Sequence, residues 1–241
     1  MAGSHLSSHI SREFDKELED IRSKVLHMGG LVEEHLSKVL DALSHGNYRL
    51  AADIAASDYK VNAMEVEIDE ECAEILARRN PAATDLRLVL AVTKIITDLE
   101  RVGDEAEKIA RMVVMLIETE NPKSYYIGVL AMGHHVRRIL HDALDAFARL
   151  DADAALSIAK EDPEVDREQD ATMRQLITYM MEDPRSITRV LNVVLAVRAM
   201  ERIGDHARNI CEDVIYLVKG KDIRHTRIED VERELRESDR G

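Results

Sequence analysis

The chain has 241 residues, of which 45% are hydrophobic, 33% are charged and 3% are aromatic, with only 10 Gly and 4 Pro. This composition favours long helices over sheets. The formal net charge of −14 excludes a general affinity for nucleic acid, because that affinity depends on Lys and Arg neutralising phosphates. No stretch approaches about 20 consecutive apolar residues, and the N-terminus lacks the apolar core of a signal peptide. We therefore expect a cytoplasmic protein with no membrane-spanning helix.

Hydrophobic periodicity predicts three helices in the first half of the chain, separated by short breaks. These helices cover residues 14–43, 48–79 and 83–120. The second half repeats the same order, with predicted helices at residues 126–149, 153–181 and 186–219. Three antiparallel amphipathic helices bury their apolar stripes against one another, so each half is predicted to form a three-helix bundle.

The predicted fold is therefore all-α, with two tandem three-helix bundles related by an internal repeat. The first bundle is assigned to residues 9–120 and the second to residues 124–220, with the junction near Asn121-Pro122. Residues 221–241 mix charges of both signs with little apolar content, which predicts a flexible tail.

The repeat is clearest in one segment of each half. LERVGDEAEKIA, from Leu99 to Ala110, matches MERIGDHARNIC, from Met200 to Cys211, 101 positions later. Upstream, DYKVNAMEVEID, which starts at residue 58, aligns loosely with DPEVDREQDATM, which starts at residue 162, 104 positions later. Each half therefore has the same internal order.

The repeated segment places two carboxylates on one helix face. Glu100 and Asp104 are four positions apart, as are Glu201 and Asp205, which puts each pair about 5–6 Å apart at Cβ. Such like-charged pairs weaken a helix, and the glycine inside each turn costs roughly 0.5–1 kcal/mol relative to Ala. A hard cation would convert this repulsion into coordination, and the glycine would let a neighbouring backbone or ligand approach. Ordinary solvated acids, paired with the arginine of the same motif, remain the alternative.

In an antiparallel helical hairpin, residues equidistant from the turn face each other. Counting outward from the turns near residues 80 and 183 places Asp58 and Asn62 opposite the first pair, and Asp162 and Asp166 opposite the second. Four acidic or amide ligands suit Mg²⁺, Mn²⁺ or iron better than a closed structural zinc site. The sequence therefore predicts a four-ligand metal site in each bundle.

The two predicted sites are not equivalent. Asn62 is a weaker ligand than Asp166, which occupies the same place in the second half. His206 and Asn209 are further donors that only the second half offers. We therefore expect tighter metal binding in the second half.

With these motifs in hand, the chain resembles the PhoU family of bacterial phosphate-signalling proteins. The resemblance is carried by LERVGDEAEKIA, MERIGDHARNIC, VNAMEVEIDEEC and QLITYMMED, and it covers about residues 9–225. It implies two three-helix bundles, frequent dimerisation and paired motifs that hold multinuclear metal clusters. Residue by residue, the family motif falls on Glu100, Asp104, Glu201, Asp205, Asp58, Asn62, Asp162 and Asp166, and Asn62 departs from it.

The same resemblance implies a function. It describes a negative regulator of phosphate uptake that acts between the ATPase of a phosphate ABC transporter and a sensor histidine kinase. Such a regulator restrains phosphate-starvation gene expression when phosphate is plentiful. We therefore expect a cytoplasmic homodimer, peripheral to the inner membrane, with divalent or trivalent metal ions bound.

Two other functions stay open from the residues alone. A carboxylate-bridged metalloenzyme is one, but the ferritin-like version normally needs Glu-x-x-His on two helices, and the chain contains no Glu-x-x-His. The sequence also lacks a recognisable nucleophile motif or a Gly-rich phosphate loop, so no enzyme is expected. The other is a purely structural helical scaffold in which the acids are solvated.

Overall fold

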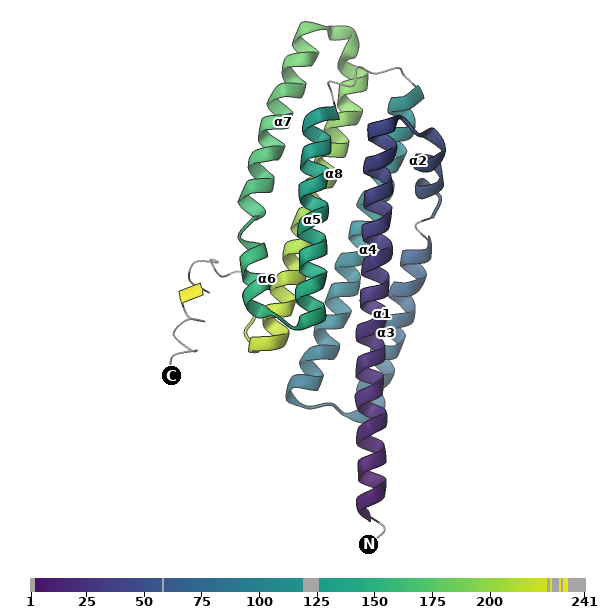
Figure 1. Ribbon diagram of the computed structural model, residues 1–241, viewed down its shortest axis with the longest axis vertical. Helices are drawn as coiled ribbons and strands as arrows, with labels where there is room; N and C mark the ends of the chain where they lie inside the picture. Colours follow the sequence, from purple (N-terminus) through teal and green to yellow (C-terminus); the bar gives the residue numbers. More distant parts are fainter. Residues whose placement is uncertain are drawn as a thin grey trace.

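A computed structural model describes residues 3–57, 59–118, 126–224, 226, 230, 232 and 233. Within these residues the chain forms helices and no strand, which confirms the predicted all-α fold (Figure 1). The first half contains α1 (Gly3–His45), α2 (Tyr48–Ala55), α3 (Tyr59–Arg79) and α4 (Ala83–Glu118). The second half contains α5 (Ile127–Arg149), α6 (Ala152–Ala159), α7 (Asp162–Glu182), the short 3-10 helix η2 (Pro184–Ser186) and α8 (Ile187–Lys219).

The predicted second helix of each half is wrong in one respect, because a break divides it into a short helix and a long one. In the first half, the hydroxyl and the backbone N–H of Ser57 both donate to the carbonyl of Ile54, which ends α2. In the second half, Pro163 has no N–H with which to continue the helix from α6, and it lies in the first turn of α7. The predicted last residues of the third helix, 119 and 120, lie outside the described residues.

Polar caps fix the starts of the two short helices, and a glycine ends the last long helix. The side chain of Asn47 accepts a hydrogen bond from the Leu50 N–H at 3.1 Å, and that of Asp151 accepts one from Ala154 at 2.9 Å. Gly220 has a positive φ of 71°, which suits glycine, and its N–H donates to the carbonyl of Tyr216. The predicted end of this helix is therefore confirmed.

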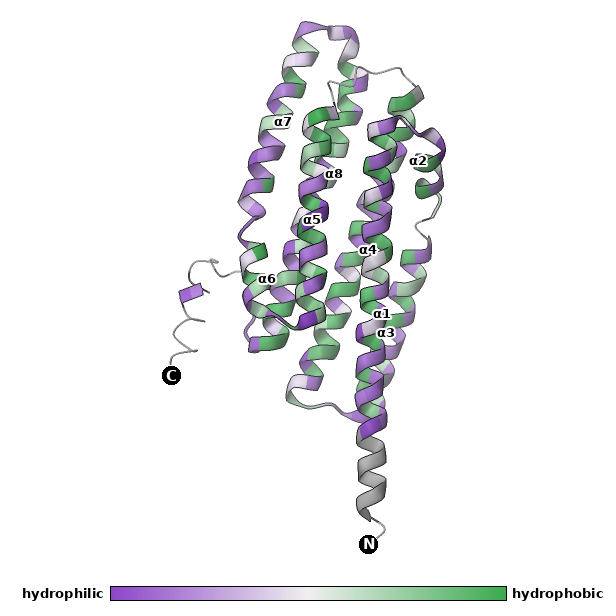
Figure 2. Cartoon of the chain, in the orientation of Figure 1, coloured by the Kyte–Doolittle hydropathy of each residue, from purple (hydrophilic) through white to green (hydrophobic). Residues whose placement is uncertain are grey.

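The two halves pack directly on each other through α4 and α8, the pair of helices with the most extensive contact. The two helices run antiparallel, because Lys94 reaches Asp213 while Glu105, further along α4, reaches Arg202, which precedes Asp213. Figure 2 shows hydrophobic and hydrophilic residues alternating along each long helix, as amphipathic packing requires. Leu99 and Met200, equivalent residues of the two repeats, are both fully buried. The motif helices therefore form the centre of the molecule.

Among the described residues, no helix combines the length and the apolar character needed to cross a membrane. Of the predicted flexible tail, only residues 221–224, 226, 230, 232 and 233 are described, and Ile223 is buried there. The flexibility of the remaining tail stays a prediction.

A close contact between α1 and α5 is repeated by the internal symmetry. Gly29 lies against Leu144, and Gly133, 104 positions after Gly29, lies against Leu40, 104 positions before Leu144. A Cβ built on Gly29 would stand 2.6 Å from Leu144 Cδ2. Both leucines are buried, so neither side chain can move freely to make room. The two glycines therefore let α1 and α5 approach closely.

This contact predicts opposite consequences for two adjacent glycines. We expect Gly29→Val to lower the free energy of unfolding by about 1–3 kcal/mol, because the added methyl groups overpack the contact with Leu144. Gly30→Val is the matched control, because nothing lies within 4 Å of a Cβ built there. Its effect should stay within about 0.5 kcal/mol, as for other surface substitutions. Urea denaturation of both variants measures this, and equal destabilisation would contradict the assignment.

Candidate functional site

The carboxylates of the second repeat lie together between α7 and α8. Glu201 is half-buried on α8, and its pKa is raised by burial and then by the charges of Asp205, Asp166 and Asp162. The pKa of Asp205 is likewise raised by burial and then by Asp162 and Asp166. The helix spacing thus brings all four acids into electrostatic contact, as the count from the turn predicts. They repel one another in the absence of a cation.

Only part of this negative charge is compensated within the protein. Arg208 Nη1 lies 2.8 Å from Asp162 Oδ2, and Arg208 Nε lies 3.1 Å from Glu212 Oε1. In the described part of the chain, Asp166, Glu201 and Asp205 form no ion pair with Lys, Arg or His. Arg198 lowers the pKa of Glu201, and His206 and Arg208 lower that of Asp205, so nearby cations compensate these acids in part. The remaining negative charge is what a metal ion or another cation would neutralise.

The side chains do not converge on a single point. Among the described residues, no group of three or more His, Cys, Asp or Glu side chains is arranged to hold a metal ion. Glu201 and Asp162 are half-buried, whereas Asp166 and Asp205 keep more of their side-chain surface in solvent. Coordination would therefore need rotation of these side chains, and the metal site stays a prediction.

The first repeat presents a different set of groups. Asn62, Glu100 and Asp104 are all half-buried, on α3 and α4, whereas Asp58 lies outside the described residues. Burial raises the pKa of a further acid on α3, Glu65; Asp104 raises it as well, and a hydrogen bond from Thr97 lowers it.

Glu65 is not among the residues predicted from the sequence, although a signal for it is present. Glu65 and Asp69 are themselves four positions apart on α3, the same spacing as in the repeated motif. Their charges interact, because Asp69 raises the pKa of Glu65. Glu65 therefore belongs to the set of acids that faces the first motif.

The glycine of the second motif has a packing role. A Cβ built on Gly204 would stand 3.3 Å from Val165 Cγ1 of α7. The missing side chain thus lets the side chain of Val165 approach, whereas the sequence predicted the approach of a backbone or a ligand. This contact holds α7 close to α8, and the close approach brings Asp162 and Asp166 within range of the motif acids.

The expectation that His206 and Asn209 add ligands to the second site is not supported by their positions. His206 Nδ1 lies 2.8 Å from Asp98 Oδ1, and Asn209 Nδ2 donates to the same oxygen at 3.1 Å. Asp98 is on α4, so both side chains point towards the other repeat and away from α7. A single sequence cannot reveal this, because it depends on how α4 packs against α8.

A cavity of about 310 Å³, lined in part by Asp98 and Asn209, lies between α4 and α8. Lys94 Nζ is 3.0 Å from Asp213 Oδ1 and 4.7 Å from the centre of the Tyr216 ring. Burial nevertheless raises the pKa of Asp213 to about 6, against the opposing effect of Lys94. Both acidic and basic side chains line this cavity, so it does not favour either a cation or an anion.

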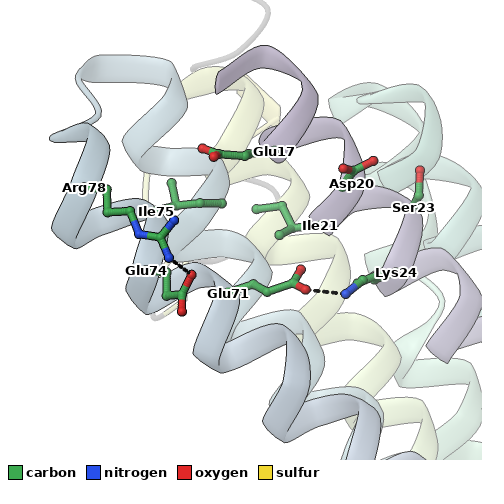
Figure 3. A pocket seen from close by; sticks show the side chains of 9 residues that line it. All are labelled: Glu17, Asp20, Ile21, Ser23, Lys24, Glu71, Glu74, Ile75 and Arg78. Atoms are coloured by element: carbon green, nitrogen blue, oxygen red, sulfur yellow. Dashed lines mark hydrogen bonds and ion pairs between the residues drawn. The ribbon is translucent and has the colours of Figure 1, made fainter. Parts of the chain in front are cut away.

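A second cavity, of about 410 Å³, lies between α1 and α3 (Figure 3). Its acids are compensated, because Lys24 Nζ bonds Glu67 Oε1 at 2.5 Å and also bonds Glu71, and Arg78 bonds Glu74. The pairs of Lys24 join α1 to α3, whereas Arg78 and Glu74 both belong to α3. The contrast identifies the α7/α8 acids as the less compensated group.

Two helical repeats that bury their motif helices against each other, with acids on the outward faces, define a class of duplicated helical-bundle proteins. A PhoU domain model matches residues 25–113 and 129–214, one copy for each repeat. The chain belongs to the PhoU family.

Known relatives agree in sequence and in structure. The chain is 51% identical to the phosphate-specific transport system accessory protein PhoU homolog of Pseudomonas aeruginosa, over 98% of this chain and 97% of that protein. It is 46% identical to the accessory protein PhoU of Escherichia coli, over 92% and 91% of the two chains. The crystal structure of PhoU from Pseudomonas aeruginosa is similar to it with a TM-score of 0.84 and 53% identity, covering 86% of this chain and 100% of that one. The phosphate transport system regulatory protein PhoU from Streptococcus pneumoniae gives a TM-score of 0.80 at 33% identity, covering 87% and 98%.

The raised pKa of Asp213 predicts a pH-dependent stability. The folded-state pKa of about 6 lies above the ordinary value of 3.8, so the folded protein binds this proton more tightly than the unfolded chain does. The resulting stabilisation is complete below pH 3.8 and is lost as the pH rises through about 6. At about 1.4 kcal/mol per pKa unit, the loss is on the order of 2–3 kcal/mol.

Asp213→Asn should remove this contribution while keeping the shape of the side chain. We expect the difference in unfolding free energy between the variant and the wild type to shift in favour of the variant between pH 4 and pH 7. Urea denaturation across that range measures the difference, to which other carboxylates contribute equally in both proteins. Parallel pH profiles would show that Asp213 titrates normally.

Proposed function

We propose that this protein is a metal-binding negative regulator of phosphate uptake and of phosphate-starvation signalling. In this proposal it is an adaptor without catalytic activity, which links the ATPase of a phosphate ABC transporter to a sensor histidine kinase. The observation that carries the proposal is 51% identity, over nearly the whole of both chains, to a protein named as a phosphate-specific transport system accessory protein. A second support is the regulatory protein from Streptococcus pneumoniae, which shares the fold.

The partners follow from the same relationship. An adaptor of this kind works from the cytoplasm, at the inner face of the inner membrane, and two copies of the chain form a homodimer. The net charge of −14 favours contact with basic cytoplasmic segments of membrane proteins. No nucleic acid is among the proposed partners.

Metal ions are proposed to bind the repeated carboxylates. Asp162, Asp166, Glu201 and Asp205 would hold the ions of the second repeat, and Asp58, Asn62, Glu100 and Asp104 those of the first. Oxygen donors of this type suit Mg²⁺, Mn²⁺ or iron. A bound cation would neutralise Asp166, Glu201 and Asp205, the three acids of the second repeat that form no ion pair in the described part of the chain. The second repeat is proposed to bind metal more tightly, because all four of its donors are carboxylates. In the first repeat, one of the four donors is the neutral amide of Asn62.

Deleting the gene tests the regulatory function. We expect a phosphate-starvation reporter to become active in high-phosphate medium, because the negative regulator is lost. Restoring the wild-type gene should silence the reporter again. A reporter that stays silent after the deletion would contradict the regulatory function.

Mn²⁺ titration in a calorimeter tests the metal proposal. We expect Glu201→Ala combined with Asp205→Ala to weaken Mn²⁺ binding by at least about tenfold, because two ligands are lost. Glu100→Ala with Asp104→Ala should have a smaller effect, since the first repeat has the weaker donor Asn62. Glu70→Gln with Glu74→Gln is the control, because these exposed acids have the same spacing on α3. Equal affinity in all four proteins would remove the carboxylates as the site.

A further inference from the structure

An apolar surface covers the outer face of the α7/α8 hairpin, near the turn that joins the two helices. On α7, Ile177 is 47% exposed and Met181 is 78% exposed. On α8, the exposed fractions are 41% for Ile187, 48% for Leu191 and 46% for Leu195. Large exposed side chains of this kind, gathered on two neighbouring helices, mark an interaction site when they form one patch.

The helix spacing shows that these residues share a face with the motif acids. Along α8, successive steps of four and three positions lead from Ile187 through Leu191, Val194 and Arg198 to Glu201 and Asp205. Along α7, similar steps lead from Asp166 through Gln169 and Met173 to Ile177. Such steps follow one side of a helix. The outer face of the hairpin is therefore acidic at one end and apolar at the end near the turn.

The first repeat shows that the fold does not require these apolar residues. Positions 104 apart on α3 and α7 correspond in burial, as Val61 and Val165 do, and so do positions 101 apart on α4 and α8. By this correspondence, the first repeat has Ala73 for Ile177, Ala77 for Met181 and Lys94 for Leu195. It keeps leucines, Leu86 and Leu90, in place of Ile187 and Leu191. The same architecture is thus built with small or polar residues at three of the five positions of the patch.

In the described part of the chain, the hairpin of the second repeat also lacks the cover that the first one has. α1 continues past the α3–α4 turn, and Glu17 on α1 holds Arg79 near that turn with bonds of 2.8 and 2.7 Å. The corresponding helix α5 begins at Ile127, which matches Ser23 of α1 at the offset of 104. Figure 1 shows the α7–α8 turn lying beyond the start of α5.

We propose that the outer face of α7 and α8 docks an amphipathic helix of a partner protein. The apolar ridge of that helix packs on Ile177, Leu191 and Leu195, and Lys or Arg at one end reaches Glu201 and Asp205. Helix-in-groove binding of this type uses apolar anchors three or four positions apart. The inference goes beyond the proposed function and does not depend on which pathway the protein regulates.

Charge selects this occupant over two others. A second copy of the chain would bring the same acid-lined end to the same surface, so this face is unsuited to self-association. An anionic lipid surface would be repelled by Asp166, Glu201 and Asp205, which are on the docking face. A basic helix pairs its charge with these carboxylates, which form no ion pair in the described part of the protein and outnumber Arg198, the basic residue of α8 on the same face.

A pair of synthetic peptides tests the proposal in a buffer that contains a chelator. The first is a labelled amphipathic helix with a Leu ridge and Lys in its last two turns, and in the second each Lys is replaced by Glu. We expect fluorescence anisotropy to show binding of the Lys peptide and at least about tenfold weaker binding of the Glu peptide. Ile177→Ser with Leu191→Ser should weaken binding of the Lys peptide by at least about tenfold, because both exposed side chains lose apolar contact area.

Val66→Ser with Leu90→Ser is the matched control. Both residues are exposed and apolar, they lie on α3 and α4, and Leu90 is the counterpart of Leu191. Unchanged thermal unfolding of both variants would show that the effect is local. Equal binding of the two peptides, or equal loss of binding in both variants, would overturn the proposal. Two further results would overturn it. One is that Ile177→Ser with Leu191→Ser abolishes a dimer of the chain seen by sedimentation, and the other is that it abolishes binding of the chain to phosphatidylglycerol vesicles.

Discussion

The antiparallel packing of α4 against α8 is the interaction on which the rest of the structure depends. It buries equivalent residues of the two repeats, such as Leu99 and Met200, against the other half of the molecule. Each motif helix is thereby fixed with one face inward, and its acids, at neighbouring helical positions, turn towards α3 or α7. Ion pairs across the same contact, such as Lys94 with Asp213, set the register of the two helices.

This arrangement determines how negative charge is distributed. Between α1 and α3, Lys24 pairs with Glu71 and Arg79 pairs with Glu17, which joins the two helices, and Arg78 pairs with Glu74 within α3. Between α7 and α8, Arg208 reaches Asp162, whereas Glu201 and Asp205 have raised pKa values and form no ion pair in the described residues. The charges of Arg198, His206 and Arg208 offset this only in part. The proposed metal binding and the proposed docking of a basic helix both draw on this one imbalance.

Much of the fold follows from the sequence because helical periodicity is a local property. The long helices, the repeat and the stop at Gly220 were all readable from the spacing of apolar residues and breakers. The break between α6 and α7 was missed, although Pro163 carries the physical reason for it. The corresponding break after α2 depends on hydrogen bonds of Ser57, which periodicity does not show.

The site was predictable only where helix geometry alone decides it. The four-residue spacing brought Glu201 and Asp205 to one face, and the count from the turn brought Asp162 and Asp166 opposite them. Rotation of α8 relative to α4 is a tertiary property, so the direction of His206 towards Asp98 was not accessible from the sequence. Glu65 lies three positions beyond Asn62, one helical turn away from the position that the count from the turn selects.

Anomalous diffraction from a crystal soaked in Mn²⁺ tests the central claim most directly, because it locates the cation without relying on any variant. The account predicts an anomalous peak between α7 and α8, bonded to the carboxylates of Glu201 and Asp205, and a weaker peak or none at the first motif. A crystal that binds Mn²⁺ elsewhere, with no peak at these carboxylates, would contradict it.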